Sequence, residues 1–263
     1  IVNAANSLIA RNSRQLPKNI FSQNDVGHPL RLFTAVTDMD EGFRIVNQII
    51  EDKNELELTY KDFAILYRNN AQSRIFEEAL RKRNIPYRIY GGITFYQRKE
   101  IKDSLAYFRM AVNPNDDQAL LRVINYPSRG IGETTIGKIE SAASTLKASI
   151  WRVLNSDVLN QLHIKPNTLS QIHQFVSLIH SFQQLEKNID AYDCAVNIIR
   201  SSGVHQDLSI DKTVEGLSRL QNVEELFNGV RDFVAEQYNE TQTLVQLSHY
   251  LENVALLTDI DNK

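Results

Sequence analysis

The residues best suited to ligand chemistry are cations and aromatic residues within residues 85–109. Arg98 and Lys102 lie four positions apart, just after Tyr96 and a glycine pair at 91–92. Glycines let a ligand approach the backbone, aromatic rings stack on bases, and cations pair with phosphates. The segment is therefore a candidate site for an anionic chain such as a nucleic acid. The alternatives are core packing for Tyr96 and, for Arg98, an ion pair with a nearby acid.

A glycine-rich turn, Arg129-Gly130-Ile131-Gly132, is the second candidate. It joins two predicted helices, so its backbone N–H groups and the N-terminus of the second helix can hold a phosphate without reading bases. Arg129 adds a cation, and Thr134 and Thr135 add hydroxyl donors. The alternative is a structural turn with a glycine in the left-handed conformation.

The sequence contains no residue set for catalysis or metal binding. It has no GxxxxGK[ST] loop for the phosphates of ATP and no acidic pair after a strand for Mg²⁺. The six histidines lack metal-ligand spacing with one another or with Cys194. The single cysteine excludes an internal disulfide and favours a cytoplasmic protein, and no apolar run is long enough to cross a membrane.

Positive charge is concentrated in one part of the chain. Residues 81–138 carry eleven Lys or Arg and five Asp or Glu, a net charge of +6, although the whole chain has a net charge of −3. A basic segment on an acidic body is typical of a local anion-binding surface. Chance clustering on a solvated helix surface is the alternative.

The first part of the chain has the pattern of an α/β protein. Leu30–Val36, Phe63–Tyr67 and Tyr87–Tyr90 read as three strands, and amphipathic helical segments separate them. Alternating strands and helices predict a partial parallel sheet. Beyond Asn113-Pro114-Asn115 only helical periodicity is found, which places a domain boundary between residues 114 and 115.

Three motifs resemble one protein family. They are YGGITFYQRKEIKDSLAYFR at Tyr90–Arg109, AILYRNNAQSRIFEEAL at Ala64–Leu80 and PSRGIGETT at Pro127–Thr135. In this order they resemble UvrD/Rep/PcrA-type ATP-dependent DNA helicases of superfamily 1. Weaker similarity covers IVNAAN at Ile1 and two segments near the end, Arg219–Leu226 and Leu251–Asp261.

The resemblance implies a fragment of such a helicase. Residues 1–114 would be the first half of the second RecA-like motor domain (2A), with some sheet neighbours missing. Residues 115–263 would be the inserted helical DNA-binding domain (2B). By this resemblance Arg98 faces single-stranded DNA and the Pro127–Thr135 segment grips duplex DNA. Arg74, within the stretch NAQSR, is expected to organise the start of a helix.

The resemblance also implies the role of the full-length enzyme. It would bind ATP and Mg²⁺, move 3′ to 5′ on single-stranded DNA and unwind duplex DNA in repair or replication. Its partners would be single-stranded and duplex DNA and the remaining helicase domains of the same chain. The fragment alone is expected to lack ATP hydrolysis. The alternatives are the helicase part of a helicase-nuclease and a non-catalytic interaction or DNA-binding module.

Overall fold

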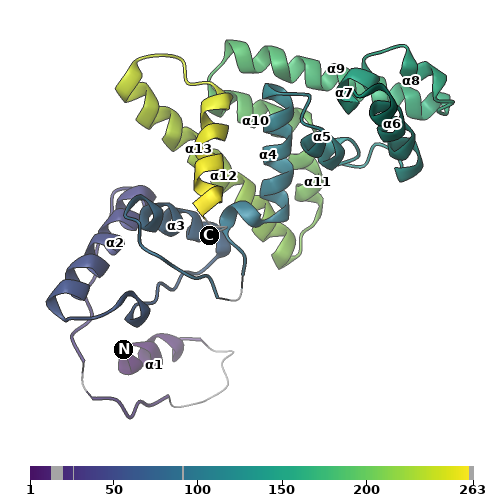
Figure 1. The fold of residues 1–263 in the computed structure, drawn as a ribbon. Coiled ribbons are helices and arrows are strands. Elements are labelled where there is room, and N and C mark those ends of the chain that lie inside the picture. Colours follow the sequence, from purple (N-terminus) through teal and green to yellow (C-terminus); the bar gives the residue numbers. More distant parts are fainter. Residues whose placement is uncertain (13–19, 26, 91, 261–263) are drawn as a thin grey trace.

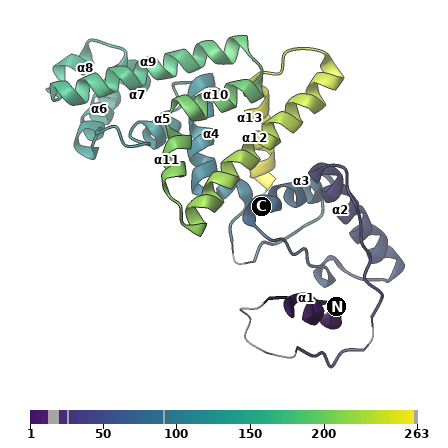
Figure 2. The same ribbon diagram turned by 180° about the vertical axis from the view of Figure 1, so that it is seen from behind.

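The computed structural model of the chain describes residues 1–12, 20–25, 27–90 and 92–260, so Gly91 of the glycine pair and Asp261 of the last similar segment lie outside the described residues. The described elements are helical (Figures 1 and 2). In order they are α1 (Val2–Ile9), α2 (Asp38–Glu55), η1 (Tyr60–Asp62), η2 (Asn70–Gln72), α3 (Ser73–Lys82), η3 (Phe95–Gln97), α4 (Lys99–Val112), α5 (Asp117–Val123), α6 (Glu133–Leu146), α7 (Ile150–Leu154), α8 (Val158–Gln161), α9 (Pro166–Asn188), α10 (Ala191–Ser201), α11 (Val204–Ile210), α12 (Val214–Thr241) and α13 (Leu247–Ile260).

The predicted parallel sheet is wrong, because the part of the chain that the structure describes contains no β-strand. The segments Leu30–Val36, Phe63–Tyr67 and Tyr87–Tyr90 have irregular or extended backbone, and no backbone hydrogen bond joins one to another. A strand needs a neighbour for its N–H and C=O groups, and an apolar pattern alone does not supply one. Leu66, in the expected strand Phe63–Tyr67, is 94% exposed.

Local sequence signals account for where many helices begin. A side-chain oxygen at the N-cap accepts a backbone N–H from the first turn of the helix. Thr37 does so for α2, Asp116 for α5, Asp190 for α10 and Thr213 for α12. Pro166 occupies the first position of α9, where its missing N–H has no partner to lose. None of the helices that the structure describes is long and apolar enough to cross a membrane.

Helix α4 is the centre of the larger of two hydrophobic clusters. Ile101 and Phe108 of this helix are fully buried, and α4 contacts α5, α9, α10, α12 and α13. In both ribbon views α4 passes between these helices (Figures 1 and 2). The smaller cluster joins α2 and α3 through Val46, Ala79 and Leu80. The smaller cluster takes its buried residues from before α4, and the larger one from η3, α4 and the helices that follow. The domain boundary between residues 114 and 115 stays a prediction.

A cavity placed beside α4 tests this packing. Phe182 of α9 is fully buried and its ring meets that of Tyr107 edge-on, with ring centroids 6.4 Å apart. Phe182→Ala is expected to lower the free energy of unfolding by about 3–5 kcal/mol in urea, because lost burial and a residual cavity both destabilise the core. Leu146→Ala, at a side chain 50% exposed, is the control and should change stability by less than about 1 kcal/mol. Equal effects would contradict the assignment of this core.

Candidate nucleic-acid interface

The glycine-rich turn is a fixed hairpin between α5 and α6. The side-chain oxygen of Asn125 accepts the N–H groups of Arg129 at 2.9 Å and Ile131 at 3.1 Å. Ile131 is fully buried and anchors the turn from below. Gly130, with φ +73°, is the glycine in the left-handed region, where other residues are strained. Gly132 has φ −79° and ψ 165°, so it is extended and caps α6.

Arg129 lies underneath the hairpin and makes its contacts within the protein. Its Nη1 donates to the carbonyl oxygens of Val123, Tyr126 and Pro127 at 2.9–3.1 Å. Its Nη2 donates to the Tyr107 hydroxyl at 2.7 Å and to a backbone carbonyl at the end of α10 at 3.1 Å. The geometry favours a positioning role, in which Arg129 joins the hairpin to α4 and α10.

Burial raises the pKa of the Tyr107 hydroxyl to about 12, although the adjacent Arg129 cation opposes this rise. The hydroxyl therefore stays protonated at neutral pH. It can accept a hydrogen bond from Arg129 while its own proton points to the backbone carbonyl of Tyr126. The neutral Tyr107 hydroxyl and the backbone carbonyls therefore accept the hydrogen bonds of the Arg129 guanidinium, and no buried carboxylate of the described residues takes part.

The hairpin also has backbone N–H donors that are not used within the described part of the protein. Among the described residues, no acceptor meets the backbone N–H groups of Gly130, Gly132, Glu133 or Thr134. Gly130, Gly132 and Thr134 are exposed, and Thr135 is half-buried. The first N–H groups of a helix carry partial positive charge and suit a phosphate oxygen. The arrangement can bind one phosphate through neutral donors.

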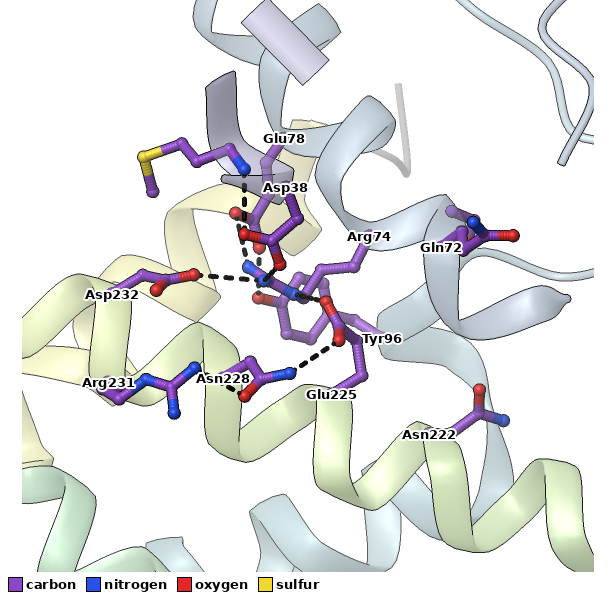
Figure 3. Close-up of polar contacts among 12 residues, drawn as sticks. Asp38, Gln72, Arg74, Glu78, Tyr96, Asn222, Glu225, Asn228, Arg231 and Asp232 are labelled. Atoms are coloured by element: carbon purple, nitrogen blue, oxygen red, sulfur yellow. Dashed lines mark hydrogen bonds and ion pairs between the residues drawn. The ribbon is translucent and has the colours of Figure 1, made fainter. Parts of the chain in front are cut away.

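A second polar assembly, here called the polar junction, surrounds Arg74 (Figure 3). Arg74 is 1% exposed and reaches Glu78 of its own helix at 3.0 Å. From α12, Glu225 approaches its Nε at 2.7 Å and Asp232 its Nη2 at 3.2 Å. Asp38, at the start of α2, lies 4.0 Å from Nη2. Four carboxylates from three helices thus surround one guanidinium.

A close helix approach makes the polar junction possible. Gly229 of α12 faces the guanidinium, and a Cβ built there would lie 3.2 Å from the Arg74 Nη1. Burial opposes the positive charge of Arg74, but the negative charges of Glu78 and Glu225 outweigh it and raise the pKa above its usual value. Arg74 therefore stays charged while it lies between α3 and α12.

The predicted DNA-contacting residues Tyr96 and Arg98 lie beside the polar junction. Tyr96 is 3% exposed and donates its hydroxyl proton to Glu78 at 3.2 Å. Burial, together with the nearby Tyr250, raises the pKa of Tyr96 well above its usual value. Arg98 is 7% exposed and donates to Asn222 and to Ser73, both at 2.8 Å.

Arg98 consequently joins α3 and α4 to α12 in the same way as Arg74 joins α2 and α3 to α12. Burial lowers the pKa of Arg98, and the negative charges of Glu77 and Glu100 partly offset this effect. Asn222 in turn donates to Glu100, which completes a chain of polar contacts from α3 to α4. The sequence analysis considered an ion pair between Arg98 and a nearby acid. Neither Glu100 nor Asp103, the acids nearest to it in the sequence, pairs directly with Arg98; Asp103 binds Lys99 and Arg122 instead.

Comparison with known proteins identifies the family. Residues 1–263 match the family described as the UvrD-like helicase C-terminal domain. The chain belongs to this family. It is 33% identical over 261 residues to the ATP-dependent DNA helicase PcrA of Staphylococcus aureus. The matched region covers 99% of this chain and 35% of the relative. It is 35% identical to DNA helicase II of Salmonella typhimurium and of Escherichia coli, each time over 97% of this chain and 35% of the relative.

The chain therefore spans about a third of the length of these relatives. ATP and Mg²⁺ were expected in the full-length enzyme. No group of three or more His, Cys, Asp or Glu side chains suited to a metal ion is found in the described part of this UvrD-like domain. The sequence of this chain lacks a GxxxxGK[ST] phosphate loop.

Lys102 remains as the exposed cation of the first candidate site. Its ammonium group lies on the surface of α4 and has no hydrogen-bond or ion-pair partner among the described residues. The structure thus separates the predicted site residues of this UvrD-like domain into two groups. Tyr96 and Arg98 are buried, and the partly buried Arg129 is occupied by acceptors within the protein. Lys102, Gly130, Gly132 and Thr134 are exposed.

The polar junction is the feature that the sequence analysis missed. Arg74 and Glu78 are four residues apart on one helix, which is a visible signal. Their partners Glu225 and Asp232 lie about 150 residues later, and nothing local indicates the pairing. Only the packing of α12 on α3 brings them together.

Removing the charge of Arg74 tests how much the polar junction contributes to the stability of the fold. Arg74→Gln is expected to lower the free energy of unfolding by about 3–5 kcal/mol, because the partly buried carboxylates of Glu225 and Asp232 lose their counter-charge. Lys82→Gln is the matched control, since Lys82 also joins α3 to α12 through an ion pair with Glu236. In this pair both the ammonium of Lys82 and the carboxylate of Glu236 are exposed. The control should lose less than about 1 kcal/mol. Urea unfolding followed by circular dichroism compares the two, and equal losses would contradict the assigned role.

Proposed function

We propose that this UvrD-like domain belongs to an ATP-dependent DNA helicase and grips duplex DNA through the hairpin of Gly130 to Thr135. The observation that carries the proposal is a set of backbone N–H groups, at Gly130, Gly132, Glu133 and Thr134, that meet no acceptor among the described residues. They lie on a hairpin that Arg129 and Asn125 hold in place. The names of the relatives, which include ATP-dependent DNA helicase, support it. Neutral backbone donors hold phosphate oxygens and read no bases, so the grip is independent of DNA sequence.

The proposal extends to the protein that contains this chain. In it, other domains bind ATP and Mg²⁺ and drive movement 3′ to 5′ on single-stranded DNA in repair or replication. The present chain supplies the duplex-holding arm and part of the single-strand track, and it does not hydrolyse ATP alone. Within the track Lys102 meets phosphates directly, whereas Arg98 and Tyr96 position α4 from inside the fold.

A matched pair of substitutions at one residue isolates the backbone donor. Gly132 has φ −79°, close to the value that proline requires, and a Cβ there would meet nothing within 4 Å. Gly132→Pro removes the N–H, and Gly132→Ala keeps it. The proline variant is expected to bind a short duplex about ten- to a hundredfold more weakly, since one hydrogen bond to a charged group is lost. The alanine variant should bind like the wild type.

Fluorescence anisotropy with two duplexes of unrelated sequence measures both variants, and circular dichroism checks that helix content is unchanged. The proline effect should be the same for both duplexes, because phosphate contacts carry no sequence information. Equal affinities of the proline and alanine variants would contradict phosphate binding by this N–H group and would leave the hairpin a purely structural turn.

A further inference from the structure

A surface pocket of about 710 Å³ lies where α6 ends and α7 begins, at the opposite end of α6 from the hairpin. Lys147 closes α6 in the left-handed conformation, with φ +49°, and the chain turns there into α7. Lys147, Ser149 and Arg152 line the pocket together with Asn115, Asn155 and His180. Figure 1 shows the helices concerned, α6, α7 and α9, close together at one end of the molecule.

The charge of this α6–α7 pocket is one-sided. Lys147 and Arg152 are exposed, and neither side chain has a hydrogen-bond or ion-pair partner among the described residues. No carboxylate lines the pocket. Asp116 and Asp117, the acids next to Asn115 in the sequence, are not among the lining residues. Asp116 accepts the N–H of Ala119 at 3.0 Å, and Asp117 accepts the N–H of Ile150 at 2.8 Å. The pocket therefore offers two unpaired cations to an anion.

The floor of the pocket is already fixed. Trp151 is 7% exposed and its ring meets that of His180 edge-on at 5.1 Å. Asn155 holds both, because its amide nitrogen donates to the Trp151 carbonyl at 2.9 Å and its oxygen lies 3.0 Å from the His180 Nε2. The Ser149 hydroxyl donates to the Asn115 oxygen at 2.6 Å. A ligand thus meets ordered polar groups and has to order only the two cationic side chains.

We infer that the α6–α7 pocket binds a phosphate group, with Lys147 and Arg152 as its cationic partners. A planar guanidinium and a point-charged ammonium together suit the several oxygens of a phosphate. The site is independent of the hairpin, since the 14 residues of α6 separate the two by roughly 20 Å at the rise of an α-helix. The phosphate belongs either to a nucleic acid backbone or to a small phosphate compound.

The only tryptophan of the chain lines this pocket, so its fluorescence reports on the site directly. The 263-residue chain is titrated with pyrophosphate and, separately, with a short DNA oligonucleotide, and isothermal titration calorimetry with pyrophosphate runs alongside. We expect a saturable change in Trp151 emission. A response to pyrophosphate alone identifies a small phosphate compound, and a tighter response to DNA identifies the nucleic acid backbone.

The double variant Lys147→Ala with Arg152→Ala is expected to weaken the saturable binding about tenfold or more, because two charge-assisted contacts are lost. Lys61→Ala with Arg68→Ala is the matched control: it removes one lysine and one arginine that are also exposed and have no side-chain partner among the described residues. The control should bind like the wild type. Absence of saturable binding in both fluorescence and calorimetry, or equal binding by the two double variants, would overturn the inference.

Discussion

The arrangement of this domain depends on one buried positive charge. Arg74 is almost completely shielded from water, and a charge in that position is tolerated only when carboxylates surround it. The carboxylates come from α2, α3 and α12, so satisfying this charge fixes how the long helix α12 lies against α2 and α3. The smaller hydrophobic cluster is too limited to determine this geometry alone.

Arg98 makes a second buried link to α12, through neutral oxygens instead of carboxylates. It joins Ser73 at the start of α3 to Asn222 of α12, and Asn222 continues to Glu100 of α4. The guanidinium groups of Arg74 and Arg98, each with directional contacts, therefore form one row of polar contacts along α12, here called the seam. Hydrogen bonds require particular distances and angles, whereas apolar contacts allow sliding. The seam accordingly sets the register of α12 against its neighbours, and the larger core supplies the bulk of the buried apolar surface.

The helices and their caps could be predicted from the sequence, because apolar spacing and capping residues are local. The beginning of α9 at Pro166 and the cap of α5 at Asp116 are of this kind. The sheet could not be judged in this way, since a strand such as Phe63–Tyr67 depends on a neighbour that local pattern does not reveal. For Arg98 and Arg129 the residue type indicated phosphate binding, but the internal acceptors that occupy both guanidinium groups are visible only in three dimensions.

The internal use of Arg129 has a consequence for how the hairpin behaves in different ionic surroundings. A lysine or arginine that neutralises a phosphate displaces condensed counterions, and this displacement makes binding fade as salt rises. The hairpin presents uncharged peptide groups instead, while its cation is occupied beneath. The proposed contact with a duplex should therefore be modest in dilute buffer and little affected at higher ionic strength. Under this proposal the hairpin would retain a duplex as salt rises and would bind other polyanions only weakly.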